Sequence, residues 1–248
     1  MRTVAATALA CTALFAPAVF AQNAPTRVLV SAGARAVVEE LRPQCERALG
    51  HPLALEFGST TDLRQKIESG DAFDVTILTT PAIDALAKAG KTGAGTPLAR
   101  CGIGVGIHAG EARPDIQTPD AFKRALLHAA AIAYAGDGAS RAYIDSMFAK
   151  MGIAADLKAT IVLTHGSAAA GERIASGKGG MVLTLVSEIL PMKGIELVGP
   201  FPAELQNYIN FSAAPSKGNS PDAAKLIAFL SSPAAAPIYK AKGMEPGK

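Results

Sequence analysis

The 248-residue chain has no tryptophan, only 5% aromatic residues and a formal charge of +3. No stripe of lysine and arginine runs along it, and basic residues do not alternate with aromatic ones, so a nucleic-acid-binding surface is not expected. The four histidines and three cysteines show no HxxxH or CxxC spacing, which argues against a metal site. A glycine-rich nucleotide-binding motif is also missing. We therefore expect no metal and no other cofactor.

The composition is that of a folded protein, because 49% of the residues are hydrophobic and 18% are charged. The length suits one large domain or two small ones. At the N-terminus, Arg2 precedes an apolar, alanine-rich run over residues 4–20, and Ala21 ends a small-residue cleavage pattern. These features predict a signal peptide over residues 1–21, cleaved after Ala21. Since no other stretch is long and apolar enough to span a bilayer, we expect a soluble periplasmic protein.

The cysteines leave alternatives open. Cys11 lies in the apolar run, but Ala8 rather than leucine stands three residues before it, which disfavours lipidation. Cys45 and Cys101 would both enter an oxidising compartment, which permits a disulfide between them. Because Cys45 lies in a helical pattern and Cys101 in a strand pattern, nothing in the sequence forces them together. Two buried thiols are therefore the favoured interpretation.

Strand and helix patterns alternate along the chain. In the first part, they cover residues 27–31, 34–49, 53–57, 60–69, 74–79 and 81–89. This βαβαβα succession predicts a parallel sheet with right-handed crossovers. The extended stretch 98–108 is long enough to run from one lobe into another, and 207–214 provides a return crossing. Between the two crossings a second unit of alternating strands and helices follows.

We therefore predict an α/β fold of the two-lobed type II periplasmic binding protein class, with mostly parallel sheets and two crossover strands. The first lobe is expected to comprise residues 26–104 together with 211–248, and the second lobe residues 105–210. Two helical segments close the chain and would pack back onto the first lobe. Ligands of open parallel sheets bind at the carboxyl ends of the strands, so two such edges facing one another would form a binding cleft.

Four predicted strand-to-helix junctions are rich in small and hydroxyl residues. They are Ser31 to Arg35, Gly58 to Thr61, Gly138 to Arg141 and Gly166 to Ala168. A helix N-terminus offers free backbone N–H groups and about half a positive charge, which attracts anions. Each junction alone is equally explained by ordinary helix capping. Because two junctions fall in each lobe, together they predict an anion site. The candidate ligand-binding residues are Ser31, Ala34, Arg35, Ser59, Thr60, Ser140, Arg141 and Ser167.

The two arginines among these candidates, Arg35 and Arg141, stand just inside their junctions. Either guanidinium could bind a carboxylate or an oxyanion through two hydrogen bonds. The alternative is a solvated side chain on a helix surface. Arg141 is the stronger candidate, because it directly follows the small residues from Gly138 to Ser140.

Several stretches resemble the molybdate-binding family of ABC-importer solute receptors and, more broadly, the type II periplasmic binding proteins. The resemblance extends over nearly all of the chain after the signal peptide and is carried by residues 28–32, 57–63, 64–75, 143–152 and 223–243. It implies a monomeric periplasmic receptor that captures a small anion and delivers it to an inner-membrane ABC permease. The match is that of a divergent branch.

The resemblance does not extend to the whole ligand shell. Thr60 falls where the family has an oxyanion-binding hydroxyl, and Ser140 and Ser167 fall near two backbone donors of the family. Ala34 and Leu185, however, stand where the family has a serine and a tyrosine, so two side-chain donors are missing. A molybdate-like or sulfate-like oxyanion and an organic di- or tricarboxylate therefore both remain possible ligands.

A receptor without catalytic activity is the favoured interpretation, but some proteins that resemble this scaffold catalyse reactions, and aconitate isomerase is one of them. Isomerisation of a tricarboxylate would need anion-binding groups together with one acid–base residue. His165, beside the junction at Gly166, and Glu188 are the candidates for that residue. The competing interpretations are a surface histidine and a carboxylate at the start of a helix.

Overall fold

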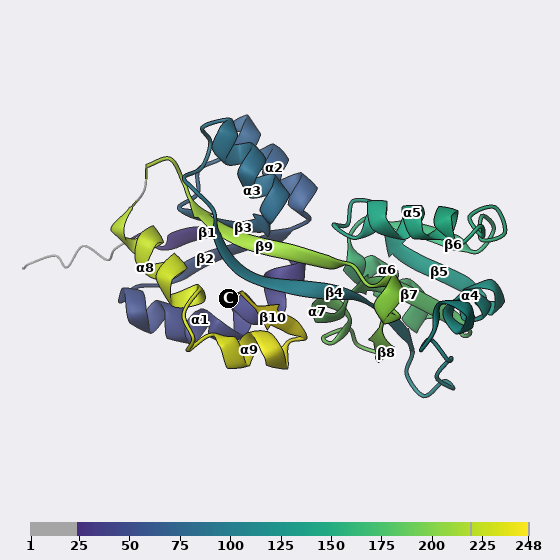
Figure 1. Cartoon of the computed structure of the whole chain (residues 1–248). Coiled ribbons are helices and arrows are strands. Elements are labelled where there is room, and N and C mark those ends of the chain that lie inside the picture. Colours follow the sequence, from purple (N-terminus) through teal and green to yellow (C-terminus); the bar gives the residue numbers. More distant parts are fainter. Residues whose placement is uncertain (1–23, 219, 248) are drawn as a thin grey trace, which may run out of the picture.

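The computed structural model describes residues 24–218 and 220–247. Two α/β lobes lie side by side and are joined by the long strands β4 (Thr96–His108) and β9 (Tyr208–Pro215), as Figure 1 shows. The predicted two-lobed α/β fold is therefore confirmed. The predicted signal peptide and Cys11 lie outside the described residues. Within the part that is described, no helix is long and apolar enough to cross a membrane.

The first lobe is built on a sheet in the order β2-β1-β3-β9-β4, in which β1 is parallel to β2 and β3. Its elements are β1 (Thr26–Ser31), η1 (Ala32–Ala34), α1 (Arg35–Leu49), β2 (Leu53–Gly58), α2 (Thr60–Ser69), β3 (Val75–Thr79), α3 (Thr80–Lys88), α8 (Pro221–Leu230), α9 (Ala236–Ala241) and β10 (Met244–Pro246). Alternate residues of β1 serve the two faces of this sheet. Val28 packs in the cluster shared with α1 and α8, whereas Leu29 packs with Leu63 of α2 and Leu86 of α3.

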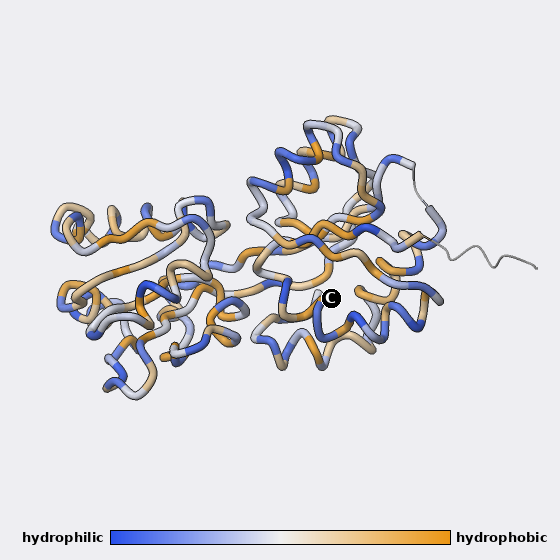
Figure 2. Tube along the Cα trace, turned by 180° about the vertical axis from the view of Figure 1, so that it is seen from behind, coloured by the Kyte–Doolittle hydropathy of each residue, from blue (hydrophilic) through white to orange (hydrophobic). Residues whose placement is uncertain are grey.

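The second lobe has the same plan, with β5 parallel to both β6 and β7. Its elements are α4 (Pro119–His128), β5 (Ala131–Ala135), α5 (Arg141–Lys150), β6 (Ile161–Thr164), α6 (Ser167–Ala175), β7 (Gly180–Leu185), α7 (Val186–Ile189), β8 (Ile195–Pro200) and η2 (Ala203–Leu205). Ala133 of β5 packs against α6, whereas Ile132 and Tyr134 face the core beneath α4 and α5. Figure 2 shows hydrophobic residues along the central strands of both lobes.

The strand β4 carries the chain from the first sheet into the second. It pairs with β9 and β10 in the first lobe and with β7 and β8 in the second. Gly106 permits this double pairing, because a Cβ atom there would lie 2.7 Å from Ile195 and 2.8 Å from Val182. The predicted lobe boundaries at 104/105 and 210/211 fall within β4 and β9.

Both described cysteines are buried free thiols. Cys45 lies in α1 and Cys101 in β4. Burial raises the pKa of the Cys45 thiol to about 11 and also raises the pKa of Cys101. Both side chains therefore act as small apolar residues of the core.

Candidate functional site

A small cavity lies between the two lobes, and we call it the inner cavity. The first lobe contributes residues that directly follow β1 and β2, and the second lobe contributes residues that follow β5, β6 and β7. Its volume is about 40 Å³, which is room for roughly three water-sized groups. The lining residues are Ser31, Ala32, Gly33, Ser59, Thr60, Ala135, Asp137, Gly138, Ala139, Gly166, Ser167, Leu185 and Glu188.

Two wider cavities adjoin the inner cavity and share lining residues with it. The first outer cavity, of about 780 Å³, lies along α2 and β9 and includes Thr60, Arg64 and Asn210. The second outer cavity, of about 660 Å³, includes Arg35 and His165. Asp137 lines all three cavities. The inner cavity therefore borders both outer cavities, and we call these two borders its openings.

The first lobe contributes a pair of hydroxyl groups to the inner cavity. Ser31 is buried at the end of β1, and its Oγ lies 3.0 Å from Oγ1 of Thr60, the first residue of α2. Ser59 has a different role, because its hydroxyl accepts a hydrogen bond from the backbone N–H of Asp62 and so caps α2. Ala34 is buried between η1 and α1 and does not line the inner cavity.

The second lobe contributes Ser167, which is buried at the start of α6 and lines the inner cavity. Gly166, just before it, has a φ of 75°, a left-handed conformation that a residue with a side chain rarely adopts. Ser140 is buried at the N-cap of α5 but does not line the inner cavity. Of the predicted candidates, the structure therefore brings Ser31, Ser59, Thr60 and Ser167 together.

The two arginines lie outside the inner cavity. Arg35 is exposed, its guanidinium lies 4.2 Å from the centre of the Phe57 ring, and it lines the second outer cavity. Arg141 contacts its own lobe, where its Nε donates to Asp145 Oδ2 at 2.5 Å. The Tyr134 hydroxyl donates to the other oxygen of Asp145 at 2.7 Å. The carboxylate of Asp145 therefore directs Arg141 away from the position expected for a ligand clamp.

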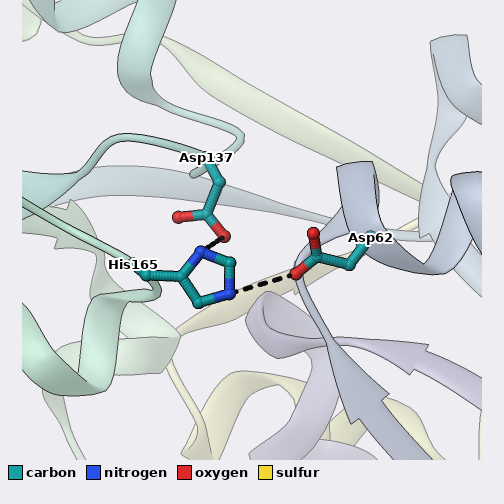
Figure 3. Close-up of side chains that lie close together, drawn as sticks. All are labelled: Asp62, Asp137 and His165. Atoms are coloured by element: carbon teal, nitrogen blue, oxygen red, sulfur yellow. Dashed lines mark ion pairs between the residues drawn. The ribbon is translucent and has the colours of Figure 1, made fainter.

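Sequence reasoning did not find Asp137, which follows β5 by two residues. Its Oδ1 accepts a hydrogen bond from the Gly166 N–H at 2.8 Å, while its Oδ2 is buried and has no hydrogen-bond partner among the described residues. Figure 3 shows His165 between two aspartates: its Nδ1 lies 3.5 Å from Asp137 Oδ2, and its Nε2 lies 3.4 Å from Asp62 Oδ2. Since Asp62 belongs to α2, His165 contacts carboxylates of both lobes.

This cluster of Asp62, Asp137 and His165 offers three donor atoms within 4.8 Å of one another. The two carboxylates, however, lie on opposite ring nitrogens of His165. A single ion could not be bound by all three side chains through one ring nitrogen without rearrangement. The geometry is instead that of a contact between the lobes.

Glu188 is the second acidic residue of the inner cavity. It lies in α7, and one of its carboxyl oxygens accepts a hydrogen bond from the Thr184 hydroxyl. Burial and the nearby charge of Asp137 raise the pKa of Glu188, although hydrogen bonds from Thr184, Ser167 and the Leu185 N–H oppose this shift. Among the described residues, those that line this cavity include no lysine, arginine or histidine. Backbone N–H groups and hydroxyls are thus the donors of this cavity, and two carboxyl groups face them.

Comparison with known proteins places this geometry in a family. Residues 26–245 match the model of the bacterial extracellular solute-binding proteins. The chain belongs to this family. The expected resemblance to molybdate-binding-like solute receptors is confirmed at the level of family and fold.

The names of the similar proteins refer to different activities and ligands. An aconitate isomerase from a Pseudomonas species is 29% identical over 229 residues, covering 88% of this chain and 87% of the relative. The periplasmic molybdate-binding protein of Azotobacter vinelandii superposes with a TM-score of 0.73 at 18% identity, covering 90% of this chain and 100% of that one. The tungstate-binding protein of Desulfovibrio alaskensis gives 0.63 at 18% identity, covering 90% and 99%. The two solved structures support the fold.

Proposed function

We propose that this solute-binding protein captures a small organic carboxylate anion in the inner cavity and delivers it to an inner-membrane ABC permease. The observation that carries the proposal is the chemistry of the cavity lining. Hydroxyls and helix N-termini from both lobes offer hydrogen bonds to an anion. Asp137 and Glu188 face the same space, and no basic side chain lines it.

The two acidic residues favour an organic acid over molybdate or sulfate. Two unit charges 4 Å apart repel by roughly 4 kcal/mol near a protein surface. Molybdate and sulfate are dianions near neutral pH, so in the inner cavity they would meet about twice the repulsion that a single carboxylate group meets. Burial raises the pKa of Glu188, which lessens the repulsion of an anion wherever this group is protonated.

Contacts between the lobes support capture by closure. The Ser187 hydroxyl of α7 donates to the Gly33 carbonyl of η1 at 2.7 Å, and His165 reaches Asp62 across the opening of the second outer cavity. A ligand that contacts both lobes would shift the population toward this closed form. Release to the permease would then require the lobes to separate.

A thermal-shift experiment on the protein beginning at residue 22 tests the proposal. The panel contains citrate, cis-aconitate, trans-aconitate, phosphate, sulfate, molybdate and tungstate, with sodium chloride of matched ionic strength as the control. A ligand that binds the folded state raises the melting temperature by mass action. We expect shifts with organic acids, and a shift with molybdate or tungstate alone would overturn the proposal.

Export and oligomeric state belong to the same proposal. The signal peptide over residues 1–21 would be removed after Ala21, and the periplasmic protein would be a monomer. Mass spectrometry of the protein recovered from the periplasm tests the cleavage site. Light scattering with and without ligand tests the monomer.

A second candidate function is isomerisation of an unsaturated tricarboxylate, which the position of Glu188 favours. A carboxylate there could remove a proton from a methylene carbon, the allylic electron pair would move by one bond, and the same group would return the proton to the other terminal carbon. His165 is less suited, because it does not line the inner cavity. The aconitate isomerase relative points to the same chemistry.

An NMR assay in D₂O separates the two functions. An isomerase would convert trans-aconitate to cis-aconitate and exchange methylene protons for deuterium. Glu188→Gln should then lose turnover and retain binding, whereas Thr80→Val, at the start of α3, should retain both. Tight binding of aconitate with neither conversion nor exchange would establish a receptor and exclude the isomerase.

A further inference from the structure

The two openings of the inner cavity differ in charge. The second outer cavity is lined by five carboxylate residues against the two cations Arg35 and Lys193. His165, at the same opening, already lies between two of those carboxylates. The five are Glu39, Asp62, Asp137, Glu172 and Glu188. A second acidic group of a ligand would be repelled on this side.

The first outer cavity is less acidic, with two carboxylates against one arginine. Its acidic residues are Glu68 and the shared Asp137, and Arg64 of α2 lines it as well. The Nε of Arg64 donates to Glu68 at 2.7 Å, which leaves four further N–H donors on the guanidinium. Neutral side chains that can donate hydrogen bonds complete the lining, namely Thr60, Thr61, Gln65, Thr79, Tyr208 and Asn210.

The volumes of the inner and first outer cavities also favour a ligand that extends beyond the inner cavity. The inner cavity, at about 40 Å³, holds one carboxylate or one tetrahedral oxyanion, whereas the adjoining first outer cavity measures about 780 Å³. Thr60, Asp137, Gly138 and Ala139 line both. A ligand seated in the inner cavity can therefore extend toward α2 and β9 without leaving the cleft.

We infer that the ligand carries at least two carboxylates, one in the inner cavity and another in the first outer cavity, where Arg64 and Asn210 bind it. This inference rests on the proposed function and narrows its ligand class to organic polycarboxylates. Arg64 comes from the first lobe, and Asn210 comes from the crossing strand β9. The protein would thus recognise both carboxylates of the ligand, and Arg64 would determine the specificity for ligands that carry the second one.

The chain supplies a matched control for Arg64. Arg35 and Arg64 are both exposed helix residues of the first lobe, and each pairs with a glutamate four residues later, Glu39 and Glu68 respectively. They differ in the opening that they line. Arg64→Gln and Arg35→Gln therefore remove the same charge from comparable exposed helix positions that line different outer cavities.

The experiment measures dissociation constants for propionate, succinate and tricarballylate, which carry one, two and three carboxylates. We expect affinity to rise at least about tenfold along this series in the unmodified protein, because each added charged group gains hydrogen bonds. Arg64→Gln should lose about tenfold in affinity for tricarballylate and should bind propionate as tightly as the unmodified protein does. Arg35→Gln should keep the rise in affinity along the series.

Each other outcome overturns a defined part of the inference. Loss of the rise in Arg35→Gln but not in Arg64→Gln would place the second group at the other opening. Equal affinity for all three acids would refute a second carboxylate site while leaving the proposed function intact. Binding of inorganic oxyanions without any organic acid would overturn the proposed function itself.

Discussion

Thr60→Val tests the hydroxyl pair of the inner cavity with little change in side-chain volume. The Thr60 hydroxyl lies 3.0 Å from that of Ser31, which is buried. Loss of this hydrogen bond should lower the free energy of unfolding by about 1 kcal/mol. If the hydroxyl also donates to the bound anion, a charge-assisted bond worth about 1.5 kcal/mol is lost, and the dissociation constant rises roughly tenfold.

Thr80→Val is the matched control for that measurement. Thr80 begins α3 as Thr60 begins α2, and its hydroxyl lies 2.8 Å from that of Ser212, which is also buried. Thr80 does not line the inner cavity. Urea unfolding should show a similar loss of stability in both variants, and calorimetric titration with an organic acid should show weaker binding in Thr60→Val alone. Equal affinities in the two variants would refute the assignment of Thr60 to the ligand site.

Three further predictions concern titratable groups. The pKa of Glu188 is raised in the folded protein, so its contribution to stability is present below the ordinary pKa of about 4.3 and is lost as pH rises. Glu188→Gln, neutral throughout, should gain stability relative to the unmodified protein as the pH rises above about 4 in urea unfolding, and a constant difference would contradict the burial argument. His165 is 79% exposed in its contacts with the two aspartates, and exposed pairs contribute about 0–1 kcal/mol. His165→Ala should therefore weaken ligand binding no more than about fivefold by titration, whereas a hundredfold loss would mean direct ligand contact. Cys45 and Cys101 are buried free thiols with raised pKa values; Ellman's reagent should detect neither in the folded protein and both after unfolding, and a disulfide would leave both undetected.

Much of the fold could be predicted from the sequence, because local patterns determine it. The crossing predicted over residues 98–108 corresponds to β4 (Thr96–His108), and the return crossing over 207–214 corresponds to β9 (Tyr208–Pro215). The helix predicted over 60–69 has the bounds of α2, with a serine cap at one end and Gly70 at the other. Short elements such as β10 (Met244–Pro246) were not predicted. Three residues carry too little periodicity, and β10 exists only through its pairing with β4.

The site was predictable only in part, because side-chain direction depends on tertiary neighbours. The junction rule led to Ser31, Thr60 and Ser167, whose positions follow directly from strand ends. It could not show that Asp145, four residues after Arg141, would bind the guanidinium. Asp137 was missed because its importance comes from Gly166, which lies 29 residues later in the chain. The one available signal was its place just after a buried strand.

The inner cavity also explains how a receptor scaffold could come to bind organic acids. Leu185 lines the inner cavity where the resemblance drawn from the sequence implies a tyrosine, and two acidic groups, Asp137 and Glu188, line it as well. Fewer hydrogen-bond donors and more carboxyl groups in the cavity weaken the binding of a dianion such as molybdate or sulfate. The same lining favours a ligand that places a single charge in the cavity, since one carboxylate meets less repulsion from Asp137 and Glu188 than a dianion does. Because Glu188 lines the inner cavity, the two proposed functions share one site and differ by whether this group transfers a proton to and from the ligand.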